Sequence, residues 1–155
     1  RKNKNMNRLA VIIIALFSIT FLIRCDKTKK KTMSQNNYKH WAYIGKQQKD
    51  EFTPHVKNSY IDLHFNTEGK LGGRAGCNNY TGSFKEKKKE VVFTIGEMAS
   101  TMTMCSDEIM KQEDEYLSLL QKVTKKEQKG NKLYLYISKN EFLVFNNISD
   151  QFKPM

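Results

Sequence analysis

The feature that most constrains the fold is a glycine-rich stretch, residues 72–82, which holds four of the chain's eight glycines. Strand-like runs flank this stretch, Tyr60–Phe65 before it and Val91–Ile95 after it. Glycine is needed where φ is positive or where another backbone comes close, and Asn78 also tolerates left-handed backbone conformations. The stretch therefore predicts a sharp turn that places Cys77 at a corner of a sheet.

The N-terminal residues have the layout of an exported, lipid-anchored protein. Leu9–Ile23 is a run of fifteen uncharged residues after a basic start, as in a secretory signal, and it is shorter than a spanning helix of ~20 residues. Leu22 precedes Cys25 by three residues, as in a bacterial lipobox whose cysteine is acylated, although Arg24 replaces the usual small residue. We therefore expect residues 1–25 to be a lipoprotein signal peptide with lipidation at Cys25. An uncleaved membrane anchor and plain secretion are the alternatives.

Basic residues are concentrated outside the predicted folded body. The formal net charge is +11, but five of the 27 basic residues precede Cys25 and four more lie in Lys27–Lys31. Residues 26–37 are polar and aperiodic, which is typical of a flexible tether. The remaining body is only slightly basic, so a nucleic-acid partner is not expected. We expect a location in the cell envelope, anchored to a membrane through the lipid and facing the periplasm, because the residues after Cys25 are mainly basic.

Residues 38–150 are expected to form one folded domain. Period-2 alternation and turn residues predict strands at Tyr38–Ile44, Ser59–Phe65, Lys70–Arg74, Tyr80–Lys85, Val91–Ile95, Lys132–Ser138 and Glu141–Asn146. The only tryptophan, Trp41, is interpreted as a core residue of the first strand. Residues 47–58 are polar and are expected to be a loop. Residues 98–104 are expected to be a short strand or an irregular lead-in.

One amphipathic helix is predicted from Asp107 to about Lys122. Ser106 offers an N-cap, and acidic residues in the first turn favour the positive end of the helix dipole. Residues at helical spacing follow, mostly apolar: Ile109, Glu113, Tyr116, Leu117, Leu120 and Val123. The predicted fold class is therefore α+β, an antiparallel barrel-like sheet with one packed helix, preceded by an N-terminal signal or anchor segment.

The order of these motifs resembles the META domain family, which includes the HslJ-like heat-inducible bacterial lipoproteins. The resemblance covers Tyr38–Asn146 and rests on Trp41, the helix and the last hairpin. It rests above all on the motif residues Gly76, Cys77, Asn78, Gly82, Thr101, Met104 and Cys105. The resemblance implies an antiparallel, barrel-like sheet with a packed helix, similar to the open barrels of type III secretion pilotins. It also implies a role in stress response or envelope integrity, with no established enzymatic activity.

The two cysteines of the predicted body, Cys77 and Cys105, are candidates for a disulfide. An exported location favours pairing, and a bond would close a loop of about 29 residues. Two buried free thiols are the alternative. A redox site is disfavoured because there is no Cys-x-x-Cys motif. A nucleophilic Cys77 would need a base, and no motif places a histidine beside it: His40, His55 and His64 are scattered along the chain.

No catalytic residue, cofactor or metal site is predicted. The histidines and cysteines lack metal-ligand spacing. The acidic run Glu113–Glu115 is interpreted as a solvated helix face. Four methionines, Met98, Met102, Met104 and Met110, would suit copper, but methionine at alternating positions more often fills a core.

Two classes of function remain. The first is a non-enzymatic envelope lipoprotein that binds or supports another envelope protein. The second is a small carrier with an apolar barrel lumen for a lipid or other hydrophobic ligand. A dry cavity lined by aromatic residues would favour the carrier, whereas a filled core would favour the first class. The residues expected to line such a lumen are Trp41, Phe65, Phe84, Phe93 and Phe145.

Overall fold

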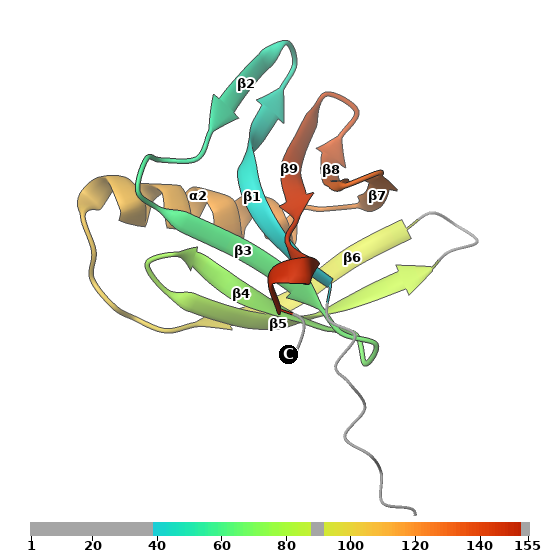
Figure 1. Ribbon diagram of the computed structural model, residues 1–155, viewed down its shortest axis with the longest axis horizontal. Helices are drawn as coiled ribbons and strands as arrows, with labels where there is room; N and C mark the ends of the chain where they lie inside the picture. The colour runs from blue at the N-terminus through green and yellow to red at the C-terminus, as the bar shows by residue number, and fades with distance from the viewer. Residues whose placement is uncertain (1–38, 88–91, 153–155) are drawn as a thin grey trace, which may run out of the picture. The chain divides into compact units, whose positions relative to one another are not determined.

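The computed structural model describes residues 39–87 and 92–152 (Figure 1). The strands of this part of the chain are β1 (Lys39–Gln48), β2 (Glu51–Pro54), β3 (Tyr60–Phe65), β4 (Lys70–Gly76), β5 (Asn79–Lys87), β6 (Val92–Ser100), β7 (Lys125–Lys129), β8 (Lys132–Ser138) and β9 (Glu141–Asn147). Between β6 and β7 lies the helix α2 (Asp107–Gln121), and a 3-10 helix, η1 (Ser149–Phe152), follows β9. The predicted signal peptide with Cys25 and the predicted tether lie outside the described residues.

Every strand pair is antiparallel, and together they form one sheet in the order β6-β5-β4-β3-β1-β9-β8-β7, with β2 paired to β1. The sheet curls so that its two edge strands approach each other, and one hydrogen bond links them: Phe93 N in β6 donates to Thr124 O, just before β7, at 3.0 Å. One helix within the described ranges, α2, packs against β4 and β6. The fold is therefore the predicted α+β arrangement, a curled antiparallel half-barrel with a packed helix.

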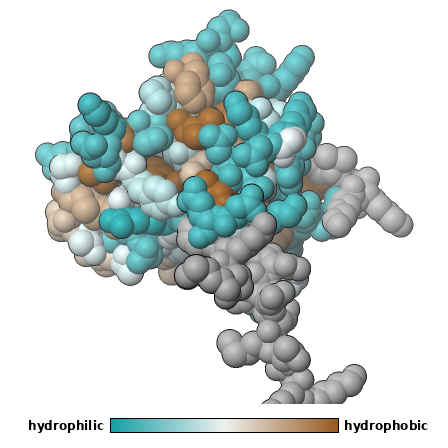
Figure 2. Space-filling view, viewed as in Figure 1, coloured by the Kyte–Doolittle hydropathy of each residue, from teal (hydrophilic) through white to brown (hydrophobic). Residues whose placement is uncertain are grey.

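Alternating side chains fill the inside of the curled sheet. In β3, Ile61, Leu63 and Phe65 are buried, while Tyr60 is exposed, as the period-2 pattern predicts. The helix adds Tyr116 and Leu120, both 2 % exposed or less. On the face shown in Figure 2, hydrophilic residues predominate and apolar ones form small separate patches. In the described residues, no helix has the length and apolar character needed to cross a bilayer.

Two segments differ from the sequence prediction. Residues 47–58 are not simply a loop, because β1 continues to Gln48 and pairs with β2 in a hairpin. The segment Lys125–Lys129 forms the edge strand β7, which carries no apolar residue and was not predicted. The helix begins at Asp107 as expected. Its N-cap residue, Ser106, makes no side-chain capping bond, but its carbonyl accepts from Met110 N at 3.0 Å.

Candidate functional site

The residues of the family motif come together at one corner of the sheet, Gly76–Asn78 with Thr101–Cys105, which we call the motif corner. Gly76 ends β4 with a φ of 118°, a conformation that L side chains rarely adopt. A Cβ on Gly76 would also lie 3.3 Å from Cγ2 of Ile109 in α2. Glycine at this position therefore permits both the turn and the close approach of the helix.

Glu113 connects the helix to the motif corner. The prediction that Glu113 belongs to a solvated helix face is wrong, because this residue is only 3 % exposed. One carboxylate oxygen accepts from Cys77 N at 3.0 Å and from Asn78 N at 2.7 Å, and the other accepts from Asn78 Nδ2 at 2.7 Å. Three N–H donors thus compensate the buried charge, as a buried carboxylate requires.

Asn78 extends this network to the segment that leads into α2. Its Nδ2 also donates to Thr103 O at 3.0 Å, while its Oδ1 accepts from Thr101 Oγ1 at 2.8 Å and from Thr103 N at 2.6 Å. Both N–H bonds and both lone pairs of the amide are therefore used. Asn78, 2 % exposed, fixes the path of the chain between β6 and the helix.

The structure joins Cys77 and Cys105 in a disulfide, with an S–S distance of 2.03 Å and Cα atoms 6.0 Å apart. The bond links the corner to the residue just before the N-cap of α2. The prediction that the methionines before Cys105 fill the core is wrong for two of them, because Met102 and Met104 are 96 % and 85 % exposed. Polar bonds and the disulfide hold this segment, whereas Met98 does pack against the core.

Gly82 is required by close packing between β5 and β6. A Cβ on Gly82 would lie 2.8 Å from Cγ of Met98, its partner in the neighbouring strand. The seven motif residues therefore all belong to the corner or to the strand pair beside it. Gly76, Cys77, Asn78, Thr101 and Cys105 hold the helix or its entry segment against the sheet, Gly82 packs β5 against β6, and the side chain of Met104 is exposed.

Tyrosine hydroxyls form a second polar link between α2 and the sheet. Tyr80 donates to Asp62 O at 2.9 Å, so the 2.8 Å bond between Tyr80 and Tyr116 has Tyr116 as its donor. Burial raises the pKa of both phenols well above the usual value. Both groups are therefore neutral hydrogen-bonding groups.

The histidines are not all scattered, because His40 and His64 lie side by side on β1 and β3, with ring centroids 5.4 Å apart. Burial lowers the pKa of both imidazoles below the usual value. The negative charge of Asp62 opposes this by raising both pKa values, but it is the smaller effect. His64 lies four residues along β3 from Tyr60, the partner of Gly76, or roughly 13 Å from the motif corner. Among the described residues, no three His, Cys, Asp or Glu side chains form a group suited to a metal ion.

A pocket of about 550 Å³ opens at the other end of β4, and we call it the mouth pocket. Its walls are mixed apolar and polar, formed by Lys39, Trp41, Phe65, Asn66, Thr67, Gly69, Phe84, Glu86, Lys126, Gln128 and Leu133. Since β4 has seven residues, the pocket and the motif corner are separated by roughly 20 Å of strand.

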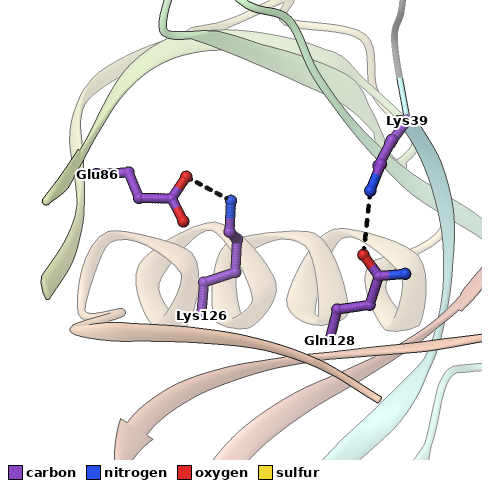
Figure 3. A network of polar contacts seen from close by, with 4 residues as sticks. All are labelled: Lys39, Glu86, Lys126 and Gln128. Carbon is purple, nitrogen blue, oxygen red and sulfur yellow. Dashed lines mark hydrogen bonds and ion pairs between the residues drawn. The ribbon is translucent and has the colours of Figure 1, made fainter. Parts of the chain in front are cut away.

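One ion pair and one hydrogen bond connect residues that line the mouth pocket (Figure 3). Lys126 Nζ pairs with Glu86 Oε2 at 2.8 Å, which ties β7 to β5. Lys39 Nζ donates to Gln128 Oε1 at 3.2 Å, which ties β1 to β7. The two ammonium groups thus reach the pocket from different strands, and one of them bonds to a neutral amide.

An aromatic cluster lies beneath Lys126. Its Nζ is 5.0 Å from the ring centroid of Phe93, 5.3 Å from that of Phe65 and 5.8 Å from that of Phe84. The three rings pack on one another with centroids 5.2–5.8 Å apart. A cation over aromatic faces is favourable, so Lys126 is held by the rings as well as by Glu86.

The predicted aromatic lumen is mostly core. Trp41, Phe65 and Phe84 line the mouth pocket, whereas Phe93 and Phe145 do not. Of the five, only Phe84 is partly buried, and Trp41, Phe93 and Phe145 are at most 1 % exposed. The polar residues of the pocket were missed by the sequence prediction. One signal was present: Lys126 and Gln128 alternate along an edge strand, and inward-pointing charges are common on sheet edges.

Comparisons with known proteins agree with this architecture. The model of the META domain family matches residues 31–150. No curated protein sequence matches the chain.

Solved structures similar to this chain share its fold at low sequence identity. A protein from Burkholderia xenovorans, solved by NMR, is 20 % identical, with a TM-score of 0.60 over 70 % of this chain and 81 % of that one. A DUF4847 family protein from Bacteroides vulgatus is 15 % identical, with a TM-score of 0.51 over 69 % of this chain and 90 % of that one. Since the family model covers most of the sequence and the motif residues lie where the fold needs them, the chain belongs to the META domain family.

Proposed function

We propose that this META domain is a non-enzymatic component of the bacterial cell envelope, anchored by acylated Cys25 and acting through binding. The observation that carries the proposal is that the carboxylate, the amide and the cysteine sulfurs of the motif corner are all bonded within the fold. Its buried carboxylate, Glu113, and its amide, Asn78, bond to one another, to backbone groups and to the Thr101 hydroxyl, and its cysteines form a disulfide. The chemically capable groups of the corner thus hold the fold together.

The location is supported by the sequence rather than by the fold. The apolar run Leu9–Ile23, Leu22 and Cys25 form the lipobox-like pattern, and a disulfide persists in an oxidising compartment. A role in stress response or envelope integrity follows from the family resemblance. The filled interior favours an envelope protein that binds another envelope component over a carrier with a deep lumen. Since the interior is filled, a small ligand would have to bind at the mouth pocket.

Acylation is tested by feeding cells labelled palmitate. The wild-type chain should carry the label and sediment with membranes, and Cys25→Ala should lose the label, because that variant has no thiol to which the lipid can be attached. Asp26→Ala, next to the modified residue, is the control and should keep it. Label persisting in Cys25→Ala would exclude this anchor.

A further inference from the structure

We propose that the mouth pocket binds a small amphipathic monoanion, a carboxylate attached to an apolar chain. The inference rests on the binding role proposed above and names the class of ligand. A pocket of about 550 Å³ lies in the range of small-molecule sites, which combine apolar walls with a few placed polar groups.

Charge favours an anion. The described charged groups that line the pocket are two ammonium groups, Lys39 and Lys126, and one carboxylate, Glu86. Lys126 is paired with Glu86, whereas the hydrogen bond of Lys39 goes to the neutral amide of Gln128. One positive charge is therefore in excess, which matches a ligand with a single negative charge better than a polyphosphate.

The apolar walls favour a hydrocarbon tail. Trp41, Phe65, Phe84 and Leu133 line the pocket. Phe84 is only partly buried, while Trp41 and Leu133 are 1 % exposed, so Phe84 and Phe65 offer a tail most of the open apolar surface. Removing an apolar chain from water is worth ~0.8 kcal/mol per buried methylene. A carboxylate at Lys39 with its chain against these side chains satisfies both kinds of wall at once.

Glu86 gives the proposal a specific signature. Its carboxylate competes with any ligand anion for the ammonium of Lys126 and repels that anion. Glu86→Gln should therefore tighten the binding of a carboxylate, while Lys39→Met and Lys126→Met should weaken it. A purely apolar site would respond to neither change of charge.

Trp41 provides the readout, because it is the only tryptophan of the chain and lines the pocket. The full chain, reconstituted in phosphatidylcholine vesicles, is titrated with 8-bromooctanoate, whose bromine quenches a nearby indole. The neutral 8-bromooctanol has the same tail and reports partition into lipid. Lys139→Met, in the exposed turn between β8 and β9, is the matched control for loss of one lysine charge.

We expect saturable quenching by the carboxylate. Lys39→Met should weaken its apparent affinity about tenfold or more, the worth of a charge-assisted hydrogen bond. Glu86→Gln should tighten it several-fold, and Lys139→Met should leave it unchanged. Equal quenching by the acid and the alcohol, or no change in Lys39→Met, would overturn the proposal. Because palmitate labelling at Cys25 is read separately, a negative titration with normal labelling would remove the pocket ligand and leave the proposed anchor intact.

Discussion

The buried tyrosine hydroxyls of this domain form hydrogen bonds in which the donor and the acceptor can be assigned. Tyr80 has one proton, which it donates to Asp62 O, and its oxygen accepts the proton of Tyr116. Burial makes each missing partner costly, because a buried donor or acceptor left without a bond loses about 1–3 kcal/mol.

The two tyrosines should therefore respond unequally to removal of their hydroxyls. Tyr80→Phe leaves both Asp62 O and the Tyr116 hydroxyl without partners, whereas Tyr116→Phe leaves the bond from Tyr80 to Asp62 intact. We expect Tyr80→Phe to lower the free energy of unfolding by about 2 kcal/mol or more, and Tyr116→Phe by about 1 kcal/mol. Urea unfolding followed by Trp41 fluorescence measures both. Equal losses, or a larger loss for Tyr116→Phe, would show that the assigned direction of the bond is wrong.

The helix α2 depends on links to the rest of the domain. A helix of 15 residues is marginal by itself. It is held by buried apolar side chains, by Glu113 at the motif corner and by Gln112 Nε2, which donates to Ser59 Oγ at 2.6 Å. The disulfide fixes the residue at which the chain enters the helix.

Loss of this disulfide should destabilise the domain without changing its fold. The bond spans a sequence separation of 28, for which the chain-entropy model gives about 3–4 kcal/mol. Cys105→Ser should lower the melting temperature, and non-reducing mass spectrometry of the wild type should find the Cys77 and Cys105 peptides joined. Ser106→Ala is the neighbouring control and should have little effect, because its hydroxyl makes no capping bond. Two free thiols in the folded, oxidised protein would contradict the structure here.

The sequence was sufficient for elements whose stability comes from apolar alternation. It predicted the β3–β4, β5–β6 and β8–β9 hairpins and the position of α2, because β3, β8 and α2 have a periodic apolar face and turn residues mark the hairpins. It missed β2 and β7, which have no such pattern: all four residues of β2 are exposed, and β7 is made of charged and amide residues. Backbone pairing with a neighbouring strand defines both of them.

The candidate site could be predicted only in part for a related reason. The motif residues were identified, but the burial of Glu113 was not, since its partners lie 35 and 36 residues away and two of them are backbone N–H groups. Met102 and Met104 were expected in the core because methionines at alternating positions usually fill one. Their exposure follows from the polar bonds of Asn78, which fix the segment regardless of its side chains.

At the scale of the domain, the two ends of β4 have different roles. At one end, Gly76 meets α2, and the motif corner ties helix and sheet together. At the other end, the curled sheet leaves the mouth pocket between β1, β5 and β7. The motif corner thus links helix and sheet, and the mouth pocket, lined by two lysines, is the site at which we propose that a ligand binds.

The motif corner holds the helix on the sheet through Glu113 and Asn78, and a double-mutant cycle between these two residues measures that link directly. Urea unfolding is measured for the wild type, Glu113→Gln, Asn78→Ala and the double variant, with Glu113→Gln combined with Lys139→Met as a distant control. We expect each single change at the corner to cost about 1–3 kcal/mol, and the pair to show a coupling of about 1 kcal/mol or more. Additive effects within ~0.5 kcal/mol, or single variants as stable as the wild type, would contradict this role of the motif corner.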